Sequence, residues 1–244
     1  NIKGFEREGV PMESGWHSHV PTTWPTIWLD PKGTKLGEGA KNFQFNPAEA
    51  KKLLEAAGKY GMEVPYTYHS NGTGGFGGEV LVKQNEVISQ MLQQAGHFKL
   101  KIDTLHYVNE YRPKFLWNKG DFEGISGNHP LGGWPDWDLA LFSGFTPGSR
   151  NDWVRTQLPN GVHELMVQHR RESDPNKKKA LMETWQKQLA KDLPIVPHPG
   201  QASGFALQHP WLGNGGYFQN WSGGAAAETL IQAWYDKSKD PKAS

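Results

Sequence analysis

The chain has 244 residues, of which 36% are hydrophobic and 21% are charged, and its formal net charge is +1. This length supports a sizeable core in one or two domains, and the mean hydropathy of -0.69 argues against an integral membrane protein. Charges of both signs are mixed throughout, so no nucleic-acid partner is indicated. Cysteine is absent, which excludes disulfides, thiolate metal sites and a cysteine nucleophile.

Tryptophan is unusually frequent, with 11 copies. Several copies stand in loop-like surroundings: Trp24, Trp134, Trp137 and Trp211 lie beside Pro, Gly or Asp, and Trp221 lies between Asn220 and Ser222. Loop tryptophans suit a stacking surface for a ligand, and they equally suit a role in fastening long loops to the core. The sequence leaves both interpretations open.

Residues 1–45 are rich in Gly, Pro, Trp and His with little periodicity, which predicts a long, ordered connection. His17 and His19 could lie on one side of a strand and chelate a metal. No third ligand stands at a recognisable spacing, so a plain loop pair is favoured. A helix is then predicted, because Asn46 is a good cap, Pro47 suits the first helical position and Gly58 suits a left-handed end.

Residues 63–103 have the pattern of a β-α-β unit. Strand-like residues at 63–69 precede a glycine-rich loop at 71–78, and an apolar stripe formed by Leu81, Ile88, Met91, Leu92 and Ala95 predicts a helix over 79–95. Gly96 closes this helix, and residues 98–103 alternate like a second strand. The two strands should therefore be parallel, with a right-handed crossover.

The same unit contains a glycine pattern typical of dinucleotide-binding loops. Gly72, Gly74 and Gly77 satisfy G-x-G-x-x-G after a strand, and Asp103 lies where a ribose-binding carboxylate could stand. The loop is longer than a tight turn, and Asp103 lies a few residues beyond the usual separation. A nucleotide-dependent oxidoreductase is therefore the alternative, not the first hypothesis.

Residues 107–171 are predicted to mix short elements with a loop rich in aromatic, Asn and Asp residues. We expect a helix over 107–118 kinked at Pro113, a strand over 122–126, a short helix at 139–142 and an amphipathic helix from Val162 to Arg171. His169 is interpreted as a residue of that helix face and not as a ligand. Aromatic faces with a few polar groups are typical of small-molecule sites, and residues 127–153 have this composition.

The segment from Asp174 to Pro199 predicts a long surface helix. Asp174 is a good cap, Pro175 suits the first helical position, and Leu181, Met182, Trp185, Leu189 and Leu193 share one side. Pro194 ends the helix, and Ile195-Val196 is predicted to be a short buried strand or crossing segment. A last helix is expected over 225–235, before a polar tail.

No catalytic constellation is convincing. The sequence lacks H-E-x-x-H, G-x-S-x-G and G-x-x-x-x-G-K-[ST] motifs. Asp136 and Asp138 are two residues apart, whereas the acid and base of a glycosidase usually converge from separate elements. The absence of these motifs favours binding over catalysis.

Five segments, in the expected order, resemble family 5 extracellular solute-binding proteins, the dipeptide and oligopeptide receptors of bacterial ABC importers. Residues 174–197 resemble the C-terminal part of that family. Upstream, residues 45–58 are similar to its Asn-Pro-x-x-Ala-x-x-Leu-Leu-x-x-Ala-Gly segment, residues 87–96 to its next helix, 119–122 to its Lys-Gly turn, and 134–136 to its Tyr-Pro-Asp-Pro ligand segment. The resemblance covers most of residues 10–200.

This resemblance implies an α/β, periplasmic-binding-protein-like fold of type II, with two lobes that close on a solute. Residues 1–200 would form most of the second lobe, and residues 201–244 would return to lobe I. The N-terminal half of lobe I is then expected in a missing segment or in another chain. We therefore expect delivery of the solute to a membrane permease, and no enzymatic activity, cofactor or metal. The expected location is periplasmic or extracellular, with lipoprotein anchoring as an option.

The ligand-facing residues implied by this reading are Trp134, Asp136, Trp137 and Asn128, with Trp24, Trp28 and Trp153 as weaker candidates. Trp137 stands where the family has proline, so either Asp136 or Asp138 could be the carboxylate that pairs with a peptide amino terminus. Many tryptophans would also suit an oligosaccharide, whose C–H faces stack on indoles. The class of ligand, peptide or oligosaccharide, stays open.

Overall fold

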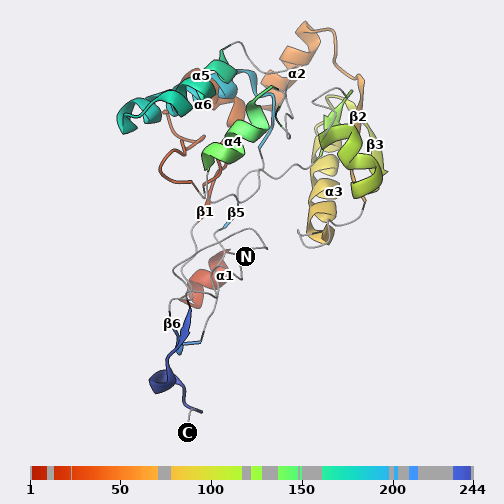
Figure 1. The fold of residues 1–244 in the computed structure, drawn as a ribbon. Coiled ribbons are helices and arrows are strands. Elements are labelled where there is room, and N and C mark those ends of the chain that lie inside the picture. The colour runs from red at the N-terminus through yellow and green to blue at the C-terminus, as the bar shows by residue number, and fades with distance from the viewer. Residues whose placement is uncertain are drawn as a thin grey trace.

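The computed structural model describes residues 2–9, 14–22, 24–70, 78–116, 122–127, 137–147, 149, 161–197, 201–202, 209–213 and 233–242. Figure 1 shows a helical part built around α4 (Trp137–Phe145), α5 (Val162–Arg171) and α6 (Pro175–Asp192), beside an α/β part containing β2 (Glu63–His69). Below them, α1 (Ile2–Arg7) lies with the described C-terminal residues. Within the described residues, no helix is both long and apolar enough to cross a membrane.

The α/β part is a parallel sheet with strand order β3-β2-β4. The central strand β2 pairs in parallel with β3 (Lys99–Leu105), starting from Glu63 opposite Lys99, and in parallel with β4 (Ile125–Ser126). The helix α3 (Gly78–Gln94) connects β2 to β3, and Gly96 follows it in a left-handed conformation with φ of 69°. The predicted β-α-β unit and its parallel strands are confirmed.

The face that α3 buries is more polar than the sequence predicts. Asn85 and Ser89 are buried, whereas Met91 is 63% exposed, so the prediction that Met91 packs inward was wrong. The reason lies on β2, where the Tyr66 hydroxyl faces α3 and donates a hydrogen bond to Asn85 Oδ1 at 2.8 Å. A buried hydroxyl requires a polar partner, and this requirement decides which side of α3 turns inward.

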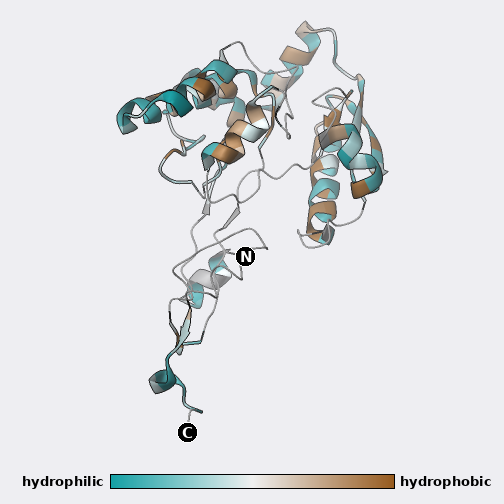
Figure 2. Ribbon diagram, viewed as in Figure 1, coloured by the Kyte–Doolittle hydropathy of each residue, from teal (hydrophilic) through white to brown (hydrophobic). Residues whose placement is uncertain are grey.

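The helix α2 (Pro47–Ala56) and the helix α6 begin as predicted. The Asn46 side chain accepts from the Glu49 amide, and Asp174 Oδ1 accepts from the amides of Asn176 and Lys177 at 2.8 and 3.1 Å. The predicted face of α6 is also correct, because Met182, Trp185 and Leu189 are buried. These side chains join the main core with α4 and α5. Figure 2 shows α4 as a largely hydrophobic helix.

Of the two forms expected after α6, a short buried strand or a crossing segment, the strand does not form. Leu193 adopts a left-handed conformation with φ of 45°, and residues 195–196 are not in a strand. Ile195 packs against the core, but Val196 is 76% exposed. The prediction for Val196 was therefore wrong, because the turn at Leu193 and the flanking prolines leave only one of the two side chains facing inward.

Of the connection predicted over residues 1–45, residues 2–7 form the helix α1 instead, and one buried side-chain amide of α6 holds the described residues between 18 and 29 in place. Gln186 is fully buried, and its Nε2 donates to the Ile27 carbonyl at 2.7 Å. Gln186 Oε1 accepts from the Leu29 amide and the Ser18 hydroxyl, both at 3.3 Å. These bonds satisfy backbone groups of a loop that has no ladder partner, so Val20, Trp24 and Ile27 can reach the core.

A close approach between η1 (Gly37–Phe43) and α6 gives a test of this packing. A Cβ at Gly39 would lie 2.5 Å from Ala190 Cβ and 2.7 Å from the Ala190 carbonyl carbon. Gly39→Ala is therefore expected to lower the free energy of unfolding by about 1–3 kcal/mol, measured by urea denaturation. Gly33→Ala is the control, because a Cβ there meets only ordinary contacts at 3.4 Å or more. Equal stabilities for the two variants would contradict this packing.

Three further elements differ from the sequence predictions. Residues Tyr107–Leu116 form one wide π-helix, η2, around Pro113, which lacks an amide hydrogen for the usual helical bond. The described strand at 122–126 is only Ile125–Ser126. Trp234–Tyr235 form β7, which pairs with β6 (Leu212–Gly213), and residue 233 is not helical, so the helix predicted over 225–235 is wrong at the three described residues, 233–235. Residues 225–232 lie outside the described part.

Two short segments from opposite ends of the chain lie side by side. β1 (Ser14–Gly15) pairs antiparallel with β5 (Gln201–Ala202), with Ser14 opposite Ala202. Figure 1 shows this pair between the helical part and the region that contains α1 and β6. The chain thus enters and leaves the upper parts at the same place.

Candidate functional site

The carboxyl ends of three parallel strands meet at one edge of the sheet. Ser70 follows β2, His106 follows β3 and Gly127 follows β4. Two bonds tie this edge together: the Ser70 amide donates to Leu105 O at 2.9 Å, and the Gly127 amide donates to Thr67 O at 2.8 Å. Ligands of open α/β sheets bind beyond such carboxyl ends, so this edge is the candidate site.

A buried tyrosine fixes the part of the edge that leads to Asn128. The Tyr111 hydroxyl from η2 donates to the Gly127 carbonyl at 2.7 Å and lies 2.6 Å from Ser126 Oγ. Burial raises the pKa of Tyr111 to about 12, so its hydroxyl stays a donor at neutral pH. His69 packs against the same ring at 5.6 Å between centroids.

Glycines are required on this edge for steric reasons. A Cβ at Gly127 would lie 2.2 Å from Asn85 Oδ1, and one at Gly124 would lie 2.3 Å from the Pro65 carbonyl oxygen. Gly124 also has a left-handed φ of 84°. β4 can therefore pair closely with β2, and this pairing fixes the position of the Gly127 backbone.

The structure describes three of the seven predicted ligand-facing residues. Trp24 is buried in the main core with 8% of its surface exposed, and Trp28 is half-buried and donates from Nε1 to the Trp16 carbonyl at 3.0 Å. Trp137 is half-buried at the start of α4. Asn128, Trp134, Asp136 and Trp153 lie outside the described residues, so the ligand-facing role of all seven stays a prediction.

Asp138 is bound by the last turn of α5. Its Oδ1 lies 3.1 Å from His169 Nδ1, and its Oδ2 accepts from Arg170 Nε at 2.8 Å. From the sequence, His169 was predicted to be a residue of a helix face and not a ligand. In the structure its surface is only 1% exposed. No local pattern indicates this contact, because 31 positions separate the two partners.

The residues of the nucleotide alternative are only partly described. Gly72, Gly74 and Gly77 lie outside the described residues. Asp103 is exposed in β3 opposite Thr67, two positions before the strand ends at Leu105. It lines a shallow notch of about 450 Å³ together with Lys101, Lys114 and Glu123, on the surface of the sheet.

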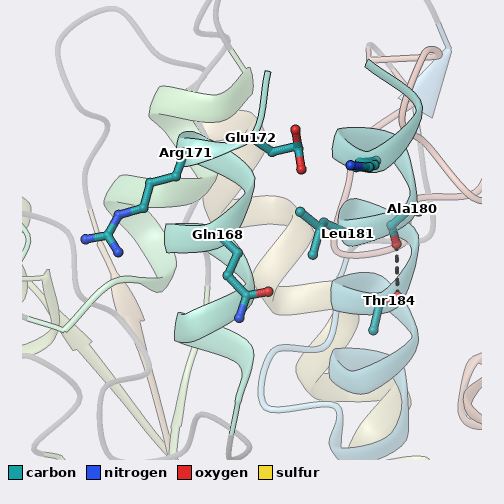
Figure 3. Close-up of a pocket in the computed structure, with 7 residues that line it drawn as sticks. Gln168, Arg171, Glu172, Ala180, Leu181 and Thr184 are labelled. Atoms are coloured by element: carbon teal, nitrogen blue, oxygen red, sulfur yellow. Dashed lines mark hydrogen bonds between the residues drawn. The ribbon is translucent and has the colours of Figure 1, made fainter. Parts of the chain in front are cut away.

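The larger groove of about 540 Å³ lies between α5 and α6. In Figure 3, Leu181 lies between the two helices, while Arg171 points away from α6. Thr184 Oγ1 donates to the Ala180 carbonyl at 2.9 Å, and the Glu172 carboxylate accepts from the Ser173 and Asp174 amides. Thr184 and Glu172 thus bind the backbone of the helices that border the groove and of the turn between them.

The two histidines of the N-terminal connection have separate partners. His19 Nε2 donates to the Ile195 carbonyl at 3.1 Å, and His17 Nδ1 accepts from the Thr22 amide at 3.2 Å. Among the described residues, no group of three or more His, Asp or Glu side chains could hold a metal ion. The geometry therefore gives these histidines hydrogen-bonding roles.

Comparisons with known proteins identify the fold through structure and not through sequence. No family model and no curated protein sequence matches the chain. The solved structure of the ABC transporter-associated periplasmic binding protein DppA from Helicobacter pylori, in complex with the peptide STSA, matches 83% of this chain with a TM-score of 0.56 and 19% identity.

Two further solved structures agree. The unliganded open form of MppA, a periplasmic murein tripeptide-binding protein, matches 87% of this chain with a TM-score of 0.59 and 17% identity. AgaA from A. tumefaciens R10, in complex with agropinic acid, matches 78% with a TM-score of 0.56 and 19% identity. The chain spans only 36–38% of the length of these three proteins. The chain therefore has the fold of one part of the two-lobed, type II periplasmic binding proteins of family 5.

Proposed function

We propose that this chain is part of the substrate-binding component of an ABC importer, which captures a peptide or another small solute between two lobes and delivers it to a membrane permease. The observation that carries the proposal is the structural match to DppA and MppA over more than four-fifths of the chain. DppA is a periplasmic binding protein solved in complex with a peptide, and MppA is a periplasmic murein tripeptide-binding protein. The protein would act as a receptor outside the cytoplasmic membrane, without catalysis.

The β1–β5 pair supports a two-lobed arrangement. We assign the chain up to about residue 200 mostly to the second lobe, and residues 201–244 to the part that returns to lobe I. In Figure 1, α1 and β6 are both on the side of the β1–β5 pair that faces away from the helical part, so α1 is assigned to the returning part in this proposal. The rest of lobe I would come from the N-terminal half of the same protein.

The carboxyl edge of the sheet gives the solute a place to bind. The described part of the chain reaches this edge at Gly127, and α4 begins with Trp137. We propose that Asn128, Trp134, Asp136 and Trp137 face the solute, with Trp24, Trp28 and Trp153 in supporting positions. Aromatic faces would exclude water, and a carboxylate would orient a donor or cation of the solute.

A fluorescence titration with a defined panel of solutes tests this function. The panel contains the tetrapeptide STSA, murein tripeptide, agropinic acid and a set of oligosaccharides. We expect saturable quenching of tryptophan emission by at least one compound on the intact protein, because closure of two lobes buries indoles. Trp137→Phe and Trp134→Phe should reduce the amplitude. A flat response to every compound would count against the proposal.

Two alternative functions predict different experimental results. A response to the oligosaccharides alone would identify a sugar-binding member of the same fold, which the number of tryptophans favours. A nucleotide-dependent oxidoreductase would instead show a thermal shift with NAD or NADP that is lost in Gly74→Ala. The position of Asp103 within β3, short of its carboxyl end, argues against this second alternative.

A further inference from the structure

The first turn of α4 is attached to the last turn of α5 by three residues that we call the α4–α5 clamp: Asp138, His169 and Arg170. His169 Nδ1 and Arg170 Nε each lie within hydrogen-bond distance of a different carboxylate oxygen of Asp138, at 3.1 and 2.8 Å. Asp138 lies at a helix amino end, and the cationic Arg170 lies at a helix carboxyl end. These two charges therefore also complement the dipoles of their own helices.

Arg170 binds α4 at a second point. Its guanidinium carbon lies 3.7 Å from the centre of the Phe142 ring. Asp138 and Phe142 are four positions apart and share one face of α4. One arginine thus fixes both the position of α4 along its axis and its rotation about that axis.

His169 also contacts the residue that precedes Asp138. Its ring centre lies 4.9 Å from that of Trp137, with 57° between the ring planes. A carboxylate only accepts hydrogen bonds, so His169 carries its hydrogen on Nδ1. Within the described part of the chain, the buried Nε2 has no hydrogen-bond partner, so a protonated ring would bury an unpaired donor.

We propose that His169 and Arg170 are positioning residues that hold Asp138 and fix the orientation of the Trp137 ring toward the solute. Asp138 then serves the clamp and does not contact the solute, which leaves Asp136 as the carboxylate of the ligand segment. Only the part of this inference that concerns the solute rests on the proposed function. The clamp itself consists of contacts among described residues.

A test without solute uses the emission of Trp137, taken as the difference between the protein and its Trp137→Phe variant. His169→Leu should shift this emission to the red and raise its quenching by acrylamide. His169→Asn should restore the original values, because its amide can donate from nearly the same place as Nδ1. An unchanged Trp137 signal in His169→Leu would overturn the proposal.

A pH titration adds a readout that a purely structural role would not move. The charged groups facing His169 are Asp138 from α4, Arg170 from its own helix and Lys178 from α6. Burial lowers the pKa of His169 despite the nearby Asp138 carboxylate. The Trp137 signal should therefore change only below pH 6.5, and this step should be lost in His169→Leu. Persistence of the step would contradict the proposal.

The binding test separates a clamp from a direct contact. His169→Leu and Asp138→Asn should each weaken binding of STSA about tenfold and change the Trp137 signal. Arg170→Lys should weaken STSA binding less, because lysine keeps the positive charge beside Asp138. Weaker binding in Asp138→Asn with an unchanged Trp137 signal would make Asp138 a direct contact and overturn the proposal. If STSA does not bind the unmodified protein, the proposed function is in doubt for this solute, and the test without solute decides the clamp.

Discussion

Trp185→Ala is expected to lower the free energy of unfolding by about 3–5 kcal/mol, which is the usual cost of truncating a large buried aromatic residue. Trp185 is fully buried on α6, and its ring meets Phe145 of α4 edge-on at 4.9 Å. The same core includes residues of α5 and of the N-terminal connection. The cavity would therefore lie where four separate segments meet, and urea denaturation would measure the loss.

Trp185→Phe provides the matched control. The indole Nε1 is buried and has no hydrogen-bond partner in the described part of the chain, so its removal relieves a desolvated donor. We expect this variant to lose only about 1 kcal/mol, because ring packing against Phe145 is mostly kept. A Phe variant as unstable as the Ala variant would show that the indole nitrogen has a partner after all.

Acidification from pH 7 to pH 4 is expected to cost roughly 3 kcal/mol of stability through His19 alone. His19 is buried beside Phe43 and Phe145, and burial lowers its pKa from 6.5 to about 4, although its bond to the Ile195 carbonyl opposes this. The neutral ring is the form that the folded protein favours. As pH falls below 6.5, the unfolded chain binds a proton first, so stability is complete above 6.5 and is lost down to about 4.

His19→Gln isolates this effect. A glutamine amide reaches the place of Nε2 and can still donate to Ile195 O, but it does not titrate between pH 4 and 7. Chemical denaturation at a series of pH values should show a shallower loss for this variant. The same acid dependence in both proteins would mean that other groups, such as His169, account for it.

Local signals predicted the elements whose ends depend on neighbouring residues. Asn46-Pro47 and Asp174-Pro175 fix helix starts through side chain and ring geometry within four positions, and the alternation over 63–69 gave β2 its observed limits. The order of these elements was enough to predict the parallel pairing of β2 and β3.

Long-range contacts decided the features that the sequence missed. The inward side of α3 follows from one hydroxyl on β2, and the buried state of Gln186 follows from backbone groups more than 150 positions away. Two-residue strands such as β1 and β5 have no periodicity to detect. For the candidate site, the sequence indicated tryptophans and carboxylates by type, but only the structure shows that Asp138 is bound to α5.

The pairing of Ser14 with Ala202 brings together the two ends of the stretch between them. His19 strengthens this closure, because its bond to Ile195 O joins the beginning and the end of the same stretch a few residues further in. A unit whose two ends meet can be gained, exchanged or circularly permuted in one genetic event without disturbing its host. In the receptor that we propose, such modularity would let the stretch between β1 and β5 diversify while the rest of the protein stays the same.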